Sequence, residues 1–192
     1  MVSINDSITE YIEKNLKKTR LKHTYSVVEE AKKLAELYGE NPKKAETAAL
    51  FHDMCKWMPA DLMNGHVKYF GLGKTLLDNN NLAHSKVAAE LMKKDYGITD
   101  EDVINAVAFH TTGRKGMSTL EKIIFLADAI EPGRDYPGVD DIRKLACVSL
   151  DKACIASLER TVEYIREKGE YLDTDTLGAL EDLKEKQKYD RT

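Results

Sequence analysis

The sequence has few cysteines and no long apolar run, and each shortage excludes a class of protein. The three cysteines, Cys55, Cys147 and Cys154, are odd in number and widely spaced. They favour reduced, buried thiols over a disulfide framework or a zinc cage. No stretch approaches the roughly 20 apolar residues that span a bilayer, and residues 1–18 lack the apolar core of a signal peptide. We therefore expect a cytoplasmic protein with no membrane partner.

An excess of positive charge is also lacking. The chain has 29 Lys and Arg against 33 Asp and Glu, a formal net charge of −4 at pH 7. This balance argues against nucleic acid as a partner, although a local basic pocket is compatible with phosphates. A chain of 192 residues that is 42% hydrophobic and 32% charged is typical of one globular domain.

Period-two alternation is almost absent, and apolar residues recur at spacings of three and four through nearly the whole chain. This periodicity indicates amphipathic helices, so we predict an all-α protein. A single domain is expected over residues 1–192, with a core at about 20–168, an amino-terminal helix at 3–18 and a polar carboxy-terminal helix at 174–188. The other helices are expected at 20–38, 42–54, 59–70, 84–96, 100–110, 119–130 and 150–168, with a short turn near 139–145.

The stretch LFHDMCK, residues 50–56, places a histidine and an aspartate at the end of an apolar helix. Ala45, Ala48 and Phe51 form a helix face that should be buried. Burial of the ionised Asp53 carboxylate beside this face is costly without a partner. Some other group must therefore compensate the charge of Asp53.

Six polar side chains share an inward placement on the expected helices: His23, His52, Asp53, His84, His110 and Asp128. A single inward histidine is more often a hydrogen-bonded core residue, and a single buried aspartate is often half of an ion pair. Six such residues are neutralised more easily together, by metal. His66 has no comparable apolar setting and is not expected to be a ligand.

Ligand chemistry narrows the choice of ion. Imidazole and carboxylate without thiolate suit iron, manganese, zinc, cobalt or nickel, whereas magnesium alone prefers an all-oxygen shell. Six side chains exceed the three or four protein ligands of an open catalytic site, so two metal ions fit better than one. Asp53 is then the natural bridging ligand.

The inward residues follow the H…HD…H…H…D order of the HD-domain metal-dependent phosphohydrolases. The segment FHTTGRKGMSTLEKIIFLADAIEPGRDYPGV, residues 109–139, is similar in more detail to the YqeK family of symmetrical bis(5′-nucleosyl)-tetraphosphatases. The similarity spans about residues 20–168. It implies an HD-domain helical bundle with a metal site where several helices converge.

The resemblance also implies a metal centre and a reaction. Two divalent or mixed-valent ions would be bound, iron first, with Mn, Zn, Co or Ni as alternatives. The two ligand sets would be His23, His52, Asp53 and Asp128, and Asp53, His84 and His110. Diadenosine tetraphosphate would be cleaved symmetrically by water into two ADP. The sequence departs from the family at Ser85-Lys86, where Gly-Pro is usual after the histidine.

The residues themselves suggest how such a reaction would proceed. A water that bridges two cations has a lowered pKa, so hydroxide is available to attack phosphorus. Fixed cations must meet the charge on the phosphate oxygens. Lys56 should reach the same cavity, and we predict Asp53, Lys56 and Arg114 as catalytic residues. Arg114 and Arg134 begin loops after ligand-bearing helices, and arginine suits bidentate phosphate binding.

The remaining substrate contacts are predicted at Arg20, Thr111 and Tyr136. Arg20 shares the face of the first histidine, although it could equally pair with a helix carboxylate. Tyr136 could stack on adenine, although such aromatic residues more often serve packing. The helix at 150–168 is expected to cover the core, and its surface is compatible with a homodimer.

Two alternative functions stay open. One is another HD nucleotide phosphohydrolase, such as a deoxynucleotide triphosphatase or a cyclic-nucleotide phosphodiesterase. The other is a non-catalytic nucleotide-sensing module that keeps the metal as a structural element. The cations Lys56, Arg114 and Arg134 argue against the sensor, because a structural metal needs no phosphate clamp.

Overall fold

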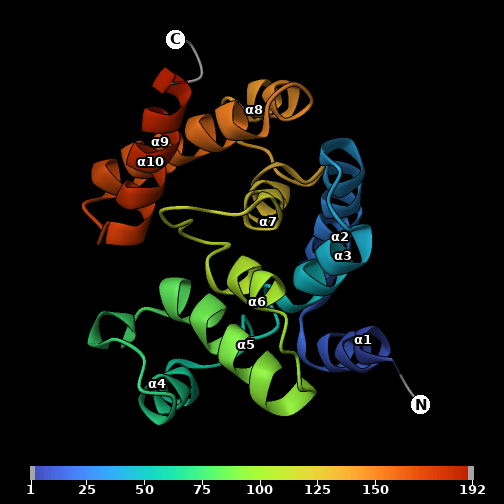
Figure 1. Ribbon diagram of the computed structural model, residues 1–192. Coiled ribbons are helices and arrows are strands. Elements are labelled where there is room, and N and C mark those ends of the chain that lie inside the picture. The colour runs from blue at the N-terminus through green and yellow to red at the C-terminus, as the bar shows by residue number, and fades with distance from the viewer. Residues whose placement is uncertain (1–2, 190–192) are drawn as a thin grey trace.

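The computed structural model describes residues 3–189, and the described chain consists of ten α-helices, one short 3-10 helix and their connections, without a strand (Figure 1). The predicted all-α class is confirmed. The α-helices are α1 (Ile4–Asn15), α2 (Lys18–Tyr38), α3 (Pro42–Phe51), α4 (Ala60–Tyr69), α5 (Asn80–Tyr96), α6 (Glu101–Ala108), α7 (Thr119–Ile130), α8 (Val139–Ala146), α9 (Leu150–Lys168) and α10 (Thr174–Tyr189), and the 3-10 helix is η1 (Lys74–Leu76).

Local sequence signals explain several helix ends. Gly39 and Gly97 have φ values of 68° and 66° and end α2 and α5, because glycine adopts this left-handed conformation without strain. Ser118 and Glu121 form a capping box at the start of α7. These ends position the segments between helices, where several site residues lie.

Several expectations are wrong in detail. Helices α1 and α3 end earlier than predicted, at Asn15 and Phe51 rather than at 18 and 54. Helix α5 begins at Asn80 rather than at His84, because the Asn79 side chain accepts a hydrogen bond from the backbone N–H of Leu82 and caps an earlier start. Cys147 is exposed, whereas the other two cysteines are buried. The reason is its position at the end of α8, outside the packed face of that helix.

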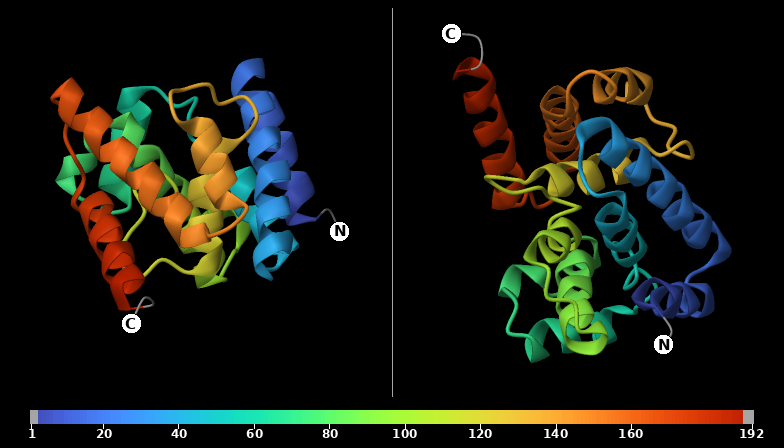
Figure 2. Two further views of the ribbon diagram at one scale, coloured as in Figure 1. Left: turned by 90° about the horizontal axis from the view of Figure 1, so that it is seen from above. Right: turned by 45° about the vertical axis from the view of Figure 1, so that its right-hand side comes forward.

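Helix α7 lies in the middle of the bundle and packs against α2, α3, α6, α8 and α9 (Figure 1). Helices α9 and α10 pack together at one end, and α1 lies at the opposite end (Figures 1 and 2). Five helices converge around the middle of the bundle: α2, α3, α5, α6 and α7. Their polar ends lie near one another there.

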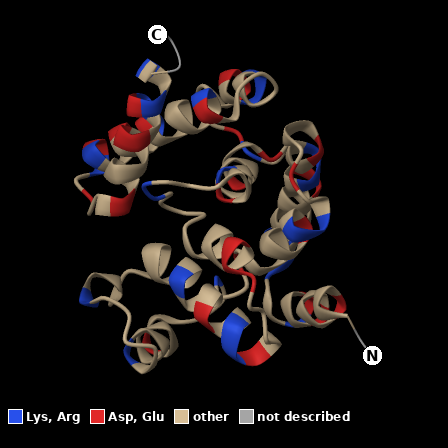
Figure 3. Cartoon of the chain, viewed as in Figure 1, with Lys and Arg blue, Asp and Glu red and all other residues tan. Residues whose placement is uncertain are grey.

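Acidic and basic residues are interspersed along the outer helices, as on α2, α5 and α10 (Figure 3). None of the helices in residues 3–189 has the length and apolarity that a membrane crossing requires.

Candidate metal centre

The structure brings the six predicted ligands together. They come from α2, from the end of α3, from α5, from the end of α6 and from α7: His23, His52, Asp53, His84, His110 and Asp128. The four central ones are at most 2% exposed. The side chains of His23 and Asp128 are 10% and 22% exposed, so these two residues form the mouth of the centre.

Asp53 belongs to two adjoining groups of potential ligands. Its Oδ2 lies 3.5 Å from His52 Nε2 and 3.7 Å from His23 Nε2. Its Oδ1 lies 3.2 Å from His84 Nε2 and 3.9 Å from His110 Nε2. Within each group the ligand atoms lie within 4.8 Å of one another. The two oxygens of one carboxylate thus face different groups, which is the arrangement of a bridging ligand.

Asp128 lies outside both groups, at the edge of the first. Its Oδ1 is 3.0 Å from His23 Nε2. Its carboxylate also forms an ion pair with Arg134, whose Nε donates to the backbone oxygen of Asp128 at 2.7 Å. Asp128 is therefore placed to complete the first ligand set.

Each of the four histidines is oriented through its Nδ1. The Nδ1–H of His52 donates to Ala49 O at 2.6 Å, and that of His110 donates to Val107 O at 2.8 Å. His84 makes the corresponding bond to a backbone carbonyl at 3.1 Å. The hydrogen bond fixes the proton on Nδ1, so that Nε2 presents a lone pair to the centre.

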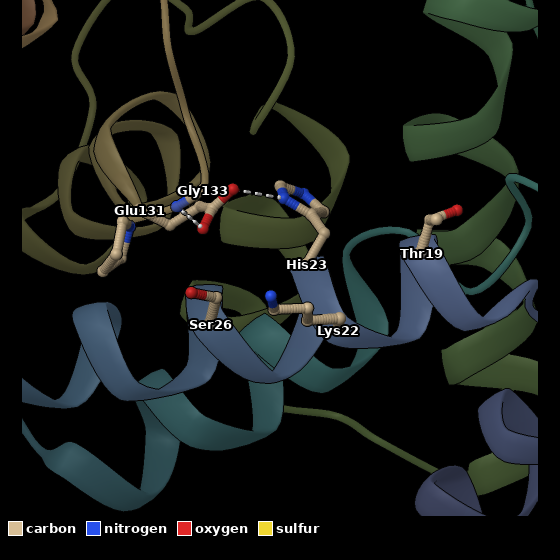
Figure 4. Close-up of a pocket in the computed structure, with 7 residues that line it drawn as sticks. Thr19, Lys22, His23, Ser26, Glu131 and Gly133 are labelled. Atoms are coloured by element: carbon tan, nitrogen blue, oxygen red, sulfur yellow. Dashed lines mark hydrogen bonds and ion pairs between the residues drawn. The ribbon is translucent and has the colours of Figure 1, made fainter.

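His23 is held by a carboxylate instead of a backbone carbonyl. Its Nδ1–H donates to Glu131 Oε1 at 3.0 Å, and Glu131 Oε2 accepts the backbone N–H of Gly133 at 2.6 Å (Figure 4). Glu131 was not predicted as a site residue, although a carboxylate directly after the helix of Asp128 is a signal that the sequence contains.

The centre holds ring nitrogens without a hydrogen-bond partner from the described chain. His23 Nε2 and His52 Nε2 are buried and have no hydrogen-bond partner in residues 3–189. His84 Nε2 and His110 Nε2 lie 3.1 Å apart. Burial, and the charges of Lys56 and of neighbouring rings, lower the pKa of both histidines, that of His110 to about 3. Two neutral rings would then face each other with their lone pairs, so this donor set fits a metal ion.

The carboxylates of the centre are ionised. Burial by itself would raise the pKa of Asp53, but His52 and His84 hold it well below its usual value. The pKa of Asp128 is also lowered, because the proximity of His23 and the charges of His52 and Arg134 outweigh burial. Negative charge at neutral pH is a further property of a cation site.

Cationic side chains surround the ligands. Arg20 Nη1 donates to Asp53 Oδ2 at 2.8 Å, and Lys56 Nζ lies 3.3 Å from His84 Nδ1. One neutral group lies there as well: the Oγ1 hydroxyl of Thr111 is 3.2 Å from His110 Nε2. The structure thus places Arg20, Lys56, Thr111 and Arg134 directly at the centre.

Two predicted substrate residues have other partners. Arg114 donates through Nε and Nη2 to both oxygens of the buried Glu121, at 2.7 and 2.6 Å. Tyr136 donates its hydroxyl to Ala129 O at 2.9 Å, and the guanidinium of Arg160 lies 4.0 Å from its ring centroid. Their roles toward a substrate stay predictions.

A helical bundle that gathers the H…HD…H…H…D residues at one buried point defines the class of HD-domain proteins. The family model described as "HD domain" matches residues 20–133. A *Bacillus subtilis* protein named "Bis(5′-nucleosyl)-tetraphosphatase, symmetrical" is 41% identical over 166 residues, which cover 86% of this chain and 89% of that protein. A *Staphylococcus aureus* protein of the same name is 42% identical, over 86% and 87%.

A solved structure of the HD superfamily also matches the chain. It is described as a predicted HD superfamily hydrolase involved in NAD metabolism from *Clostridium acetobutylicum*, and it matches with a TM-score of 0.91 and 42% identity over 97% of this chain and 99% of that chain. The chain belongs to the HD-domain family and, within it, to the family of the symmetrical bis(5′-nucleosyl)-tetraphosphatases.

Proposed function

We propose that this protein hydrolyses diadenosine tetraphosphate symmetrically into two ADP at a centre of two metal ions. The observation that carries the proposal is the shared Asp53, whose two oxygens face two adjoining histidine groups under a rim of cations. The substrate is taken from the names of the two relatives, each of which is about 40% identical to this chain over most of its length.

The donor set decides which ions fit. Histidine nitrogens and carboxylates without thiolate suit iron, which we propose first, and also Mn, Zn, Co or Ni. When bound, two such ions supply an activated water and neutralise charge on phosphoryl oxygens. His23, His52, Asp53 and Asp128 would hold one ion, and Asp53, His84 and His110 the other. A homodimer and a cytoplasmic location stay predictions from the sequence.

The protein's own cations would position the phosphates. Arg20 and Arg134 each pair with a ligand carboxylate, which holds both guanidinium groups beside the centre. Their remaining N–H groups would bind phosphate oxygens there. Burial lowers the pKa of Lys56, although nearby Asp53 raises it. Lys56 Nζ lies 3.3 Å from His84 Nδ1, so its ammonium would lie beside the ligands and meet charge that develops on the leaving phosphate.

Product analysis of the metal-loaded protein tests this function. Purified protein of measured metal content is incubated with diadenosine tetraphosphate, with cyclic dinucleotides and deoxynucleotides in parallel, and the products are separated by chromatography. ADP as sole product, lost on chelation, is the expected result. AMP with ATP would contradict symmetrical cleavage, and two bound metals without turnover of any substrate would favour the sensing module.

An Asp53→Ala variant tests the assignment of the centre. It should lose both bound metal and turnover, because both ligand groups depend on this carboxylate. Asp61→Ala, which removes an exposed aspartate on α4, is the control and should retain both. An Asp53→Ala protein with normal metal content and rate would refute the assignment.

A further inference from the structure

A cavity of about 420 Å³ opens beside the metal centre, where the connection between α1 and α2 meets the segment after α3. Its volume lies in the range of small-molecule sites. Its lining includes Asn15, Lys17, Arg20, Lys56 and Trp57. Asn15, Lys17 and Trp57 lie outside the predicted metal ligands and substrate contacts.

Two of the lining residues connect this cavity to the metal centre. Arg20 contacts Asp53, the carboxylate shared by both ligand groups. Lys56 lies against His84 of the second group. A molecule in the cavity would therefore reach the reacting point past two cations.

The charge of the cavity suits a polyphosphate. Its lining contains Lys17, Arg20 and Lys56 and no carboxylate. In the described part of the chain, neither Lys17 nor Lys56 forms an ion pair with an acidic residue. Positive charge without a local partner, beside a wall of low dielectric, attracts an anionic ligand.

Trp57 provides an aromatic surface at the outer rim. The residue is 38% exposed, and its indole N–H donates to Tyr11 Oη at 3.1 Å. This bond fixes the ring through a residue that packs against the core. A fixed, exposed indole beside phosphate-binding cations is the arrangement on which a nucleobase stacks.

We propose that this cavity binds one nucleoside 5′-diphosphate half of the substrate, with the phosphates along Lys56, Arg20 and Lys17 and the base against Trp57. The proposal rests on the proposed function, because it takes the substrate from it. The proposal states on which side of the metal centre one end of the bound dinucleotide lies.

A second cavity, of about 390 Å³, is the rival site. It lies against α9 and α10, meets the centre at Thr111, and is lined by Tyr164, Tyr171, Glu170 and Asp173 among others. Its lining contains no lysine or arginine. It therefore suits phosphates less well than the cavity of Trp57, although its tyrosines could stack on a base.

Fluorescence tests the stacking directly, because Trp57 is the single tryptophan of the chain. We expect ADP, titrated into the metal-loaded protein, to quench the Trp57 emission, whereas pyrophosphate should bind without the same quenching because it has no base. Calorimetry on the same samples establishes that each compound binds. ADP binding without any change in Trp57 emission would overturn the proposal, whether or not the protein turns over.

Steady-state kinetics with diadenosine tetraphosphate provides the second test. Trp57→Ala should raise KM about tenfold, the order expected for one lost base stack, and Trp57→Phe should retain most of the affinity. Lys17→Gln should raise KM, whereas Lys18→Gln removes an adjacent exposed charge outside the cavity and should not. A raised KM for Tyr171→Ala with an unchanged KM for Trp57→Ala would overturn the proposal. An inactive wild-type protein would instead refute the proposed function.

Discussion

Glu131 is a buried carboxylate that controls a histidine on another helix. Both of its oxygens are used, one by His23 Nδ1 and the other by the N–H of Gly133. Burial would raise the pKa of Glu131, but these hydrogen bonds lower it. The ionised group therefore accepts two hydrogen bonds and keeps His23 Nε2 directed toward Asp53 and Asp128.

Glu131→Gln should weaken metal binding by about tenfold or more, the order seen when the partner of a ligating histidine is removed. A glutamine accepts through only one atom, so either His23 or the N–H of Gly133 loses its acceptor. Metal affinity is measured by competition with a chromogenic chelator, which does not depend on turnover. Glu167→Gln, at an exposed position on α9, is the control, and equal affinities for the two variants would contradict the role of Glu131.

Arg114 has a structural role that the sequence did not reveal. Its ion pair with Glu121 joins the turn after α6 to the first turn of α7. Arg114→Ala would leave a carboxylate that is 2% exposed without its cation. Loss of one partner of a buried pair costs several kcal/mol, and the partial exposure of Arg114 reduces this to about 2 kcal/mol.

Denaturant unfolding of Arg114→Ala, Glu121→Gln and the double variant measures this cost. We expect the double variant to be less destabilised than the sum of the two single variants, because the pair acts as a unit. Lys115→Ala, at an exposed neighbouring position, should change little. Unchanged stability together with a lower kcat would instead assign Arg114 to the substrate.

At the scale of elements, α10 holds the turn that carries Thr111. Gly113 in this turn has φ of 66°, and a Cβ at this position would lie 3.0 Å from Ala179 Cβ of α10. The carboxy-terminal helix, from which the sequence suggested little contribution to chemistry, thus contacts the segment between the last histidine ligand and α7.

Gly113→Ala and Gly116→Ala form a matched pair that tests this contact. Both glycines have positive φ, but a Cβ at Gly116 would meet nothing within 4 Å. Each substitution should cost about 1–2 kcal/mol for the left-handed backbone. Gly113→Ala should cost a further ~1 kcal/mol or more, because Ala179 must move. Thermal unfolding compares the two variants. Equal shifts of Tm would show that α10 moves away from the new Cβ at no measurable cost, and would contradict the predicted difference.

The helices could be predicted from the sequence because their signals are local. A spacing of three and four apolar residues identifies each helix, and Gly39, Gly97 and Ser118 mark ends that the structure retains. The start of α5 was missed because the polar residues before His84 interrupt the apolar pattern. There the cap by Asn79 decides the boundary.

At the scale of the whole molecule, the convergence of the six ligands was predictable, whereas their supporting contacts were not. Buried polar residues on apolar faces are few, so they must meet where the helices meet. The partner of Arg114 and the cavity of Trp57 depend on how segments far apart in the chain approach one another. The amino-terminal connection of α2 and the segment after α3 are adjacent only in the folded protein.

The neutral histidines should make the metal-free protein sensitive to acid. The pKa of His110 is lowered to about 3 and that of His84 is also lowered, both chiefly by burial, whereas an unfolded histidine titrates near ~6.5. Below that pH the unfolded chain binds protons that the folded protein does not, so stability rises with pH and is lost as pH falls. His52 acts in the opposite sense. Burial alone would lower its pKa, but the charge and hydrogen bond of Asp53 have the larger effect, and the net pKa is raised.

Below ~6.5 His52 is protonated in both the folded and the unfolded chain, so it adds little to the slope there. His110 binds a proton only in the unfolded chain, and the lowered pKa of His84 adds to this difference, so the net slope should reach about one proton or more. We expect the free energy of unfolding of the metal-free protein to fall by about 1 kcal/mol or more per pH unit between ~6.5 and ~5. Denaturant unfolding at several pH values measures the slope. His110→Asn should flatten it, because the variant removes a group that titrates only in the unfolded chain, whereas His66→Asn, on α4 away from the centre, should not. A metal-free protein whose stability is constant over this range would show that protons already occupy the sites between the rings.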